Sequence, residues 1–336
     1  MMKFSHIVIV FITFFASAGM AVSQTSSGTQ EYGDGGAYEG EFLNGLPHGN
    51  GTYELPNGYR YVGEWFEGEI NGQGEALFPN GSVYIGSFVK GKPEGSGKIT
   101  FTDGGTYEGE WANGSITGEG YAKYANGTTY QGTFLDAMHD GKGIMKSPDG
   151  YIYDGTWENG VKQGKATVTY PDGSIYTGEV SQGLREGSGR LEMPEGLAYE
   201  GTWKAGEING EGKLSQKNGD VYVGTLVNGR REGLGKVTYA NGDIYEGNFA
   251  DDQRSGQGKF IGADGYKYEG SWQEGQIKGE GEVIYPDGSR YVGTFTNGLA
   301  DGLGEIIYPD GSSYSGEWVA GVIEGKGKAT YPNNAV

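Results

Sequence analysis

The side chains that most often carry out catalysis are scarce in this sequence. Histidine occurs only at His6, His48 and His139, and the 336-residue chain has no cysteine. A Ser-His-acid group would need His48 or His139, and no serine lies in the string that forms a nucleophile elbow. The lack of cysteine excludes thiolate nucleophiles and thiolate metal sites. The sequence therefore predicts no catalytic residues and no enzyme activity.

Two glycine-rich patterns could in principle hold a cofactor or a metal ion. Gly72 and Gly74 have the spacing that opens a G-x-G-x-x-G string, but the third glycine is missing and no helix follows to hold a phosphate. Asp-Gly pairs such as Asp172-Gly173 occur in calcium-binding β-rolls, which need Gly-Gly-x-Gly-x-Asp every nine residues. Because neither pattern is complete, we expect no cofactor and no metal site.

The charge of the chain limits its partners. It has 25 Lys and Arg against 44 Asp and Glu, a formal net charge of -19 at pH 7. A field of this sign repels nucleic acid and anionic membrane surfaces. We therefore expect no nucleic acid partner.

The N-terminus differs from the rest of the chain. Lys3 precedes an apolar run from Ile7 to Phe15, and small residues follow as far as Ala21. This is the three-part pattern of a secretory signal peptide, and the run is short of the ~20 apolar residues that span a bilayer. A retained membrane anchor is the alternative. We expect a signal peptide over 1–21, export to the periplasm or the extracellular space, and a polar disordered linker over 22–31.

A tyrosine recurs every 23 residues, thirteen times, from Tyr38 to Tyr314. A fixed period of this length marks an array whose repeats bury their apolar faces on one another. With Tyr as position 1, glycine occupies positions 3 and 12 in every repeat, and position 14 in every repeat but one, which has Ala166. Position 5 is always aromatic or aliphatic, and all six tryptophans occupy it. The repeats fill residues 38–336, with a half-repeat over 32–37.

The pattern within one repeat predicts two strands. Positions 1, 3 and 5 alternate with mostly polar positions, a period of two, and glycines at 12 and 14 open a second such run. Positions 20 and 21 read Asn-Gly, Asp-Gly or Glu-Gly in twelve repeats. Because these pairs tolerate the positive φ of a tight hairpin turn, we place the turns there. The predicted fold is all-β, an elongated single-layer solenoid or ribbon of thirteen 23-residue β-hairpin repeats.

The glycines share a face with the aromatic rings, so their missing side chains leave room for rings of adjacent strands. The alternative is that the rings are ligand-stacking platforms. We favour a structural core that includes the following residues: Tyr61, Gly63, Trp65, Gly72, Gly74, Tyr107, Trp111, Tyr153, Trp157, Tyr199, Trp203, Tyr268, Trp272, Tyr314 and Trp318.

One repeat, residues 61–74, reads Y-V-G-E-W-F-E-G-E-I-N-G-Q-G. This string resembles the MORN (membrane occupation and recognition nexus) repeat, and the resemblance covers residues 38–336. It implies a solenoid of β-hairpins that serves as a scaffold or targeting module and is often dimeric. The family name records proposed binding to membranes and phosphoinositides, which usually invokes basic residues.

A slower period of 46 residues lies over the first. Tryptophan at position 5 alternates with other apolar residues, and position 10 is mostly isoleucine in the Trp repeats but proline or arginine in others. We infer that Trp and Ile pack together, although duplication of a two-hairpin segment alone also explains the pattern. The alternation slips by one repeat around residues 222–267, near Arg230, Arg231 and Arg254. We predict a bend or a partner-docking site there, with these arginines as partner-binding candidates.

Three functions fit these observations. The first is a non-catalytic scaffold of the cell envelope that binds protein partners, or a second copy of itself as a homodimer, along the repeat surface. The second is a glycan or peptidoglycan binder that uses exposed Tyr and Trp rings. The third is a peripheral membrane protein that binds phospholipid through a local basic or apolar strip.

Overall fold

The structure is a computed structural model that describes residues 25–332. These residues form 27 strands and, across the described range, no helix long and apolar enough to cross a bilayer. They divide into two compact units, the described parts of Met1–Pro171 and Asp172–Val336. The predicted all-β fold of hairpin repeats is confirmed, whereas the predicted signal peptide over 1–21 lies outside the described residues.

The strands of the first unit are β1 (Thr25–Glu31), β2 (Ala37–Leu43), β3 (Leu46–Glu54), β4 (Arg60–Phe66), β5 (Glu69–Leu77), β6 (Val83–Val89), β7 (Lys92–Thr100), β8 (Thr106–Ala112), β9 (Ser115–Lys123), β10 (Thr129–Leu135), β11 (Met138–Lys146), β12 (Ile152–Glu158) and β13 (Val161–Thr169). Those of the second unit are β14 (Ile175–Ser181), β15 (Leu184–Glu192), β16 (Ala198–Lys204), β17 (Glu207–Ser215), β18 (Val221–Val227), β19 (Arg230–Thr238), β20 (Ile244–Ala250), β21 (Gln253–Ile261), β22 (Lys267–Gln273), β23 (Gln276–Ile284), β24 (Arg290–Thr296), β25 (Leu299–Ile307), β26 (Ser313–Val319) and β27 (Val322–Thr330).

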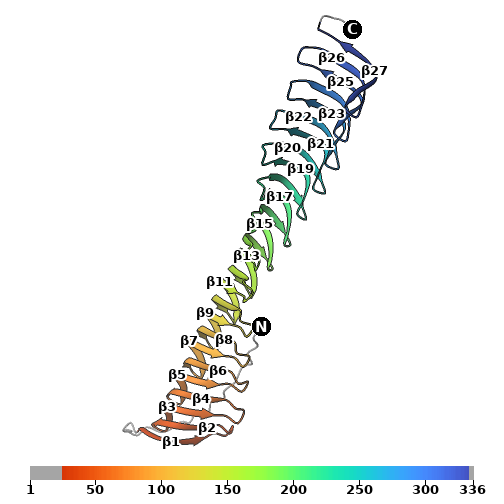
Figure 1. The fold of residues 1–336 in the computed structure, drawn as a ribbon. Helices are drawn as coiled ribbons and strands as arrows, with labels where there is room; N and C mark the ends of the chain where they lie inside the picture. The colour runs from red at the N-terminus through yellow and green to blue at the C-terminus, as the bar shows by residue number, and fades with distance from the viewer. Residues whose placement is uncertain (1–24, 333–336) are drawn as a thin grey trace. The chain divides into compact units, whose positions relative to one another are not determined.

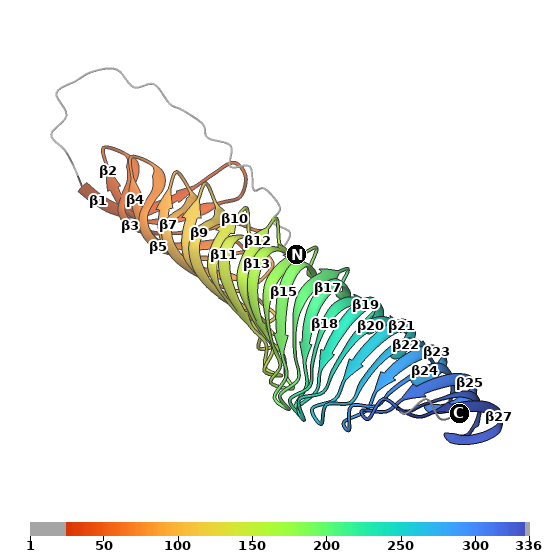
Figure 2. The ribbon, with the colours of Figure 1, turned by 90° about the horizontal axis from the view of Figure 1, so that it is seen from above.

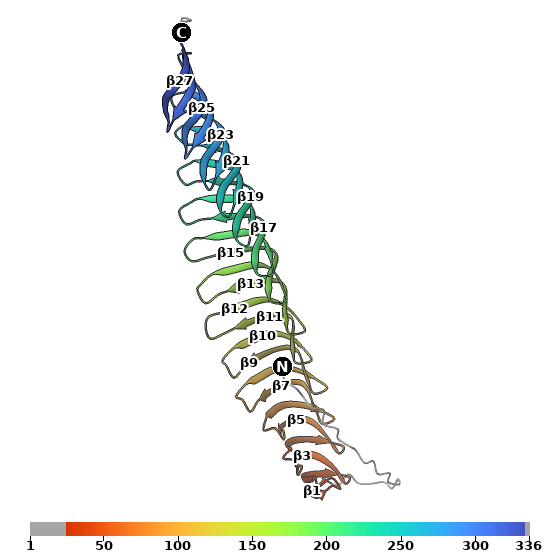
Figure 3. The same cartoon turned by 90° about the vertical axis from the view of Figure 1, so that its right-hand side faces the viewer.

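Within each unit, every strand pairs antiparallel with the strands that precede and follow it in sequence. The strands therefore follow one another in chain order along each unit (Figure 1). The connections lie alternately at one end of the strands and at the other, as the side view shows (Figure 3). Each 23-residue repeat thus contributes one hairpin of a seven-residue and a nine-residue strand, such as β2 and β3.

The recurring tyrosines use their hydroxyl groups inside the fold. In every repeat the phenol donates a hydrogen bond to the main-chain carbonyl oxygen three residues later, from Tyr38 to Glu41 (2.7 Å) through to Tyr314 and Glu317 (3.3 Å). The rings lie on one face of each unit, which we call the inner face, and the opposite face is the outer face. This bond satisfies the polar end of a buried ring, which a phenol requires.

The glycines at positions 3 and 14 make room for these rings. A Cβ atom added at Gly74 would lie within 3.0 Å of three atoms of the Tyr61 side chain, and one added at Gly63 would meet the same hydroxyl. Trp65 completes the cluster, edge-on to Tyr61 at 5.9 Å and to Tyr38 at 4.8 Å between ring centroids. Glycine is therefore required here for close approach of a ring to the main chain.

The tight turn of each hairpin lies at positions 7 and 8. Between β2 and β3, Asn44 has φ 52° and Gly45 has φ 82°, and positive φ at both residues defines a type I′ turn. Five repeats read Asn-Gly at these two positions. The tight turn predicted at positions 20 and 21 is therefore wrong.

Positions 20 and 21 lie instead in the longer loop that joins one repeat to the next. Gly58 has φ 90° and donates from its main-chain N–H to the oxygen of Leu55 (3.0 Å), whereas Asn57 keeps a negative φ. The Asn57 side chain accepts a hydrogen bond from the N–H of Tyr59 (2.9 Å). The loop is therefore a type I turn that ends at a glycine in the left-handed conformation. Asn or Asp at position 20 favours this turn because the side chain accepts a main-chain hydrogen bond.

A bulge at position 12 bends the long strand of each hairpin. Gly63 of β4 pairs with Gly74 of β5, but two residues later Trp65 pairs with Ile70. Glu64 therefore faces three residues of β5, and its carboxylate accepts a hydrogen bond from a main-chain N–H of the bulge (2.9 Å). Figure 2 shows the strands of each unit curving, as bulges of this kind produce.

The described chain begins with a strand that the sequence did not predict. Residues Thr25–Glu31 form β1 and pair with all of β2, so the predicted disordered linker over 22–31 is wrong from Thr25 on. Gly28 lies opposite Gly40, at position 14 of a partial repeat that begins before residue 32. The strand is mostly exposed, so we attribute its order to pairing with the otherwise open edge of β2.

Candidate functional site

The tyrosines and tryptophans predicted to form the core lie on the inner face. Tyr314 is half-buried. The exposed fractions of the other side chains range from 0% at Tyr61 to 7% at Trp65 and Trp318. Ile70 is the cross-strand partner of Trp65, and the other Trp-Ile repeats pair in the same way. These rings are therefore occupied within the fold and do not form an open stacking surface.

Position 10 is where the inner face varies most in chemistry. Arg185, Arg231 and Arg254 occupy it in three repeats of the second unit, and each guanidinium lies over the position 5 ring of the next repeat. The distances from the guanidinium carbon to the ring centroid are 4.1 Å from Arg185 to Trp203, 5.1 Å from Arg231 to Phe249 and 4.1 Å from Arg254 to Trp272. Cation–π contact with a ring therefore holds all three side chains on the inner face.

The three arginines differ in what their N–H groups bind. Arg185 donates to the carbonyl oxygen of Gly206 (2.7 Å). Arg231 forms a salt bridge with Asp252, with Nε 3.1 Å from Oδ1, and also donates to the carbonyl oxygen of the same residue (2.6 Å). Within residues 25–332, the guanidinium of Arg254 contacts aromatic rings but makes neither a hydrogen bond nor a salt bridge. Arg254 is thus a cation whose N–H groups remain available to a ligand.

The predicted partner-binding arginines do not form one cluster. Arg230 lies opposite Val227 on the outer face and forms an exposed salt bridge with Asp251 (3.0 Å). Arg231 and Arg254 lie on the inner face in consecutive repeats. Their role in docking a partner stays a prediction, and the structure assigns them two different faces.

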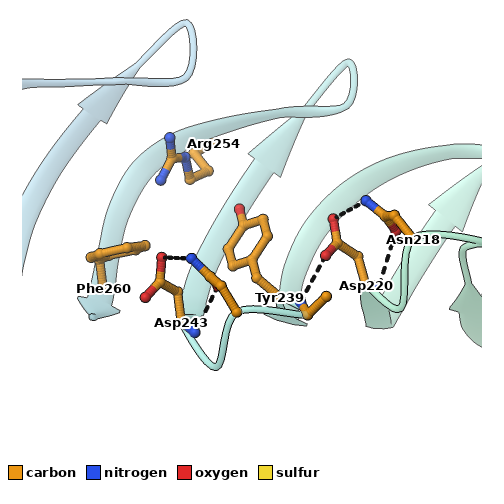
Figure 4. Close-up of a pocket in the computed structure, with 8 residues that line it drawn as sticks. Asn218, Asp220, Tyr239, Asp243, Arg254 and Phe260 are labelled. Carbon is orange, nitrogen blue, oxygen red and sulfur yellow. Dashed lines mark hydrogen bonds between the residues drawn. The ribbon is translucent and has the colours of Figure 1, made fainter. Parts of the chain in front are cut away.

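A shallow cavity of about 510 Å³ opens beside Arg254 (Figure 4). In that view Tyr239 stands in the middle, with Phe260 and Asp243 on the side of Arg254 and with Asp220 on the other side. The Tyr239 hydroxyl points away from its own loop. The cavity is lined by Asn218, Asp220, Tyr239, Ala240, Asn241, Asp243, Arg254 and Phe260.

The two aspartates of this cavity hold the same arrangement one repeat apart. Asp220 accepts from the side-chain amide of Asn218 (2.9 Å) and from the N–H of Ala240 (2.9 Å). Asp243 accepts from the amide of Asn241 (2.8 Å) and from a main-chain N–H in the next loop (2.9 Å). That main-chain donor, with the amide, lowers the pKa of Asp243, so it is ionised at neutral pH.

Sequence reasoning missed these residues because they are far apart in the chain and come from three repeats. One signal was available. Position 22 is aspartate only at Asp220 and Asp243, in two consecutive repeats. Both aspartates precede the repeat that carries Arg254, and Asp243 lies inside the region where the 46-residue alternation slips.

The outer face of the first unit carries an apolar patch, which we define as Val62, Leu77, Val83 and Ile85. Leu77 and Val83 are cross-strand partners, and Glu75 pairs with both Val62 and Ile85. Ile85 is 55% exposed, the most of the four. Two further exposed side chains, Phe66 and Val89, lie toward the turn end of the same strands.

His139 packs among aromatic side chains of the inner face. His139 stacks on the ring of Tyr130 with centroids 3.7 Å apart, and its Nε2 lies 2.6 Å from the Tyr124 hydroxyl. Burial, and then the nearby Lys162 ammonium, lower the pKa of His139 to about 4, so it is neutral at pH 7. Among residues 25–332, no group of three or more His, Asp or Glu side chains is placed to hold a metal ion.

Hairpin repeats with an internally bonded tyrosine, one per 23 residues, define this chain as a β-hairpin repeat array. The MORN repeat model matches it in thirteen segments, which begin at residues 38–58 and end at residues 314–336. The chain therefore belongs to the MORN repeat family. No curated protein matches it.

Solved structures resemble the chain only weakly. The TCP domain of Drosophila melanogaster SAS-4, in complex with a proline-rich motif of Ana2, is 16% identical over 46% of this chain and 84% of its own, with a TM-score of 0.31. The TCP10 domain of Danio rerio CPAP, in complex with a STIL peptide, is 15% identical over 80% and 93%, with a TM-score of 0.29. A streptogramin B lyase is 13% identical over 87% and 90%, with a TM-score of 0.14. TM-scores of this size carry no argument about function.

Proposed function

We propose that this chain is a non-catalytic scaffold, exported to the cell envelope, that binds a protein partner through the apolar patch of its outer face. The observation that carries the proposal is the patch itself. The recurring rings and hydroxyls bond within the fold, so contacts with a partner fall to side chains that vary between repeats. An exposed apolar cluster on a strongly charged protein is typical of an interaction site.

The charge of the chain indicates the kind of partner. The formal net charge of -19 favours a partner segment with apolar side chains flanked by lysine or arginine. Within the patch, Glu75 is the cross-strand neighbour of both Val62 and Ile85 and would face such a cation. Apolar burial supplies the affinity, and opposite charge speeds the encounter.

The test is capture of envelope proteins by the exported chain and by its Ile85→Asp variant. Burial of one Ile side chain contributes about 1.5–3 kcal/mol, so the variant should lose at least about tenfold in partner binding. Val223→Asp is the matched control. Val223 occupies the same repeat position and is similarly exposed, at 51% against 55%, but its cross-strand neighbours are Lys213 and Lys236, whereas those of Ile85 are Glu75 and Lys98.

Equal capture by the wild type and Ile85→Asp would contradict the proposal. Pelleting with neutral or anionic liposomes, abolished by Ile85→Asp, would assign the patch to a membrane instead. A shift of the wild type to a dimer in sedimentation, lost in the variant, would assign it to self-association. Docking at the arginines is tested separately by Arg230→Glu, because Arg230 lies outside the aromatic packing.

A further inference from the structure

The cavity beside Arg254 is independent of the outer-face patch and points to a second ligand. Arg254 and Arg185 provide an internal comparison, since each lies 4.1 Å above a tryptophan ring at the same repeat position. Arg185 donates a hydrogen bond to the main chain, whereas Arg254 has no such partner among residues 25–332. A guanidinium held by a ring, with its donors open to a cavity, is suited to an incoming anionic group such as a carboxylate.

The rest of the cavity limits how charged that ligand is. Asp220 and Asp243 line the same cavity, and each carboxylate is already oriented by two N–H donors. Two fixed carboxylates repel a densely anionic ligand such as a polyphosphate or an acidic peptide. Their remaining lone pairs accept hydrogen bonds from hydroxyl groups, and the neighbouring amides share in such contacts. The cavity therefore suits a hydroxyl-rich ligand that carries isolated carboxylates.

Two rings complete the cavity. Tyr239 and Phe260 both line it, and Tyr239 stands between Asp243 and Asp220 in Figure 4. Both side chains are half-buried, so each keeps part of its ring open to solvent. Aromatic side chains of this kind offer a rigid, amphipathic contact area, which matches the C–H face of a pyranose ring.

The repeat spacing matches a sugar chain as well. Asp220 and Asp243 occupy the same position in consecutive repeats, and two strands separate equivalent positions. At the usual strand spacing this separation is roughly 9.6 Å, which is about the length of two linked pyranose rings. Successive disaccharides would therefore meet the same Asp-Asn pair in successive repeats.

We infer that this cavity binds an acidic oligosaccharide, with a sugar carboxylate on Arg254 and sugar hydroxyls on Asp220 and Asp243. The rings of Tyr239 and Phe260 support the faces of the sugars between these groups. Binding is non-covalent, and it leaves the outer face free for a protein.

The test is calorimetric titration of the full exported chain with defined tetrasaccharides. The acidic probes are alternating tetrasaccharides of glucuronate with N-acetylglucosamine and of glucuronate with N-acetylgalactosamine, in which every second sugar is neutral, and the neutral probe is an N-acetylglucosamine tetramer. We expect at least one acidic probe to bind at least tenfold more tightly than the neutral one. Arg254→Ala should weaken that binding at least tenfold, whereas Arg185→Ala should leave it unchanged.

Asp220→Asn with Asp243→Asn tests the hydroxyl contacts, and we expect a threefold to tenfold loss with the neutral probe, for which no charge repulsion is relieved. Tryptophan fluorescence of each variant, compared with the wild type, verifies that the array has kept its packing. Absence of binding by both acidic probes would overturn the inference, as would binding that Arg254→Ala leaves unaltered. A tetraglutamate peptide that binds more tightly than either acidic sugar would assign the cavity to a peptide and also overturn it.

Discussion

The close approach of the tyrosine ring to position 14 gives a stability prediction that can be worked out from the structure. A Cβ atom at Gly97 would lie within 3.0 Å of three atoms of the Tyr84 side chain. That ring cannot retreat easily, because its hydroxyl donates to the oxygen of Ser87 (3.1 Å) and the rings of Phe88 and Trp111 lie 5.0 Å and 4.9 Å away. Gly97→Ala therefore forces either a strained ring or a broken hydrogen bond.

The expected cost is about 3 kcal/mol, of which overpacking contributes about 1–3 kcal/mol and the lost hydrogen bond about 1 kcal/mol. Because repeat arrays open locally, the suitable assay is amide hydrogen exchange of peptides from β6 and β7. A loss of about 3 kcal/mol would speed the exchange there on the order of 100-fold. Peptides from strands several repeats away should be unaffected.

Gly95→Ala is the matched control, two residues away in the same strand. Gly95 has φ 68°, and a Cβ atom there would come no closer than 3.9 Å to a neighbour. The Gly95→Ala variant should therefore be destabilised by only about 1 kcal/mol, the cost of placing alanine in a left-handed conformation. Exchange in Gly97→Ala that is no faster than in Gly95→Ala would refute the argument that the glycine exists to admit the ring.

Three further predictions concern single repeats of the first unit. Ala137→Gly should stabilise its hairpin by about 1 kcal/mol, because Ala137 has φ 64° in a type I′ turn, and the measurement is slower local hydrogen exchange. Tyr153→Phe should cost about 1–2 kcal/mol by leaving the part-buried carbonyl oxygen of Thr156 without this hydrogen bond, seen as faster exchange in β12, whereas unchanged exchange would deny that bond any role. The pKa of His139 is about 4 when folded and 6.5 when unfolded, so the unfolded chain binds more protons between these values and stability falls as pH drops from 6.5 to 4. With allowance for solvent screening, the free energy of unfolding should fall by about 1–2 kcal/mol, as measured by urea unfolding at pH 7 and pH 4.5. His139→Ile should remove this pH dependence.

Much of the fold could be predicted because the same residue types recur at the same positions of each repeat and therefore pack in the same way. The tyrosine at position 1 and the glycines at 3 and 14 predict a strand pair, and the structure joins them through the hydroxyl and the missing Cβ atoms. The pairing of Trp65 with Ile70 was likewise readable from the 46-residue alternation. The turn was misplaced because Asn-Gly occurs at positions 7 and 8 in five repeats and at positions 20 and 21 in five, and only the structure shows which site has positive φ at both residues.

The candidate sites were harder to predict, for a different reason. Arg254 stood out by its type, but only the structure shows that the guanidinium groups of Arg185 and Arg231 donate hydrogen bonds, whereas that of Arg254 donates none to the described residues. Asp220 and Tyr239 come from other repeats and meet Arg254 only through the stacking of hairpins. Ile85 differs from Val223 by its neighbours across the strands, which depend on register. Periodicity predicts the shared positions of a repeat, whereas both proposed sites depend on residues that depart from it.

The most direct test of the central claim, that a protein partner binds the outer face at the apolar patch, is site-specific photocross-linking in cells that export the chain. A photoreactive amino acid replaces Ile85 in one variant and Val223, at the same repeat position, in another. We predict a discrete adduct with another protein from residue 85 and none from residue 223. Adducts only to lipid, adducts only between copies of this chain, or equal labelling from both positions would contradict the account.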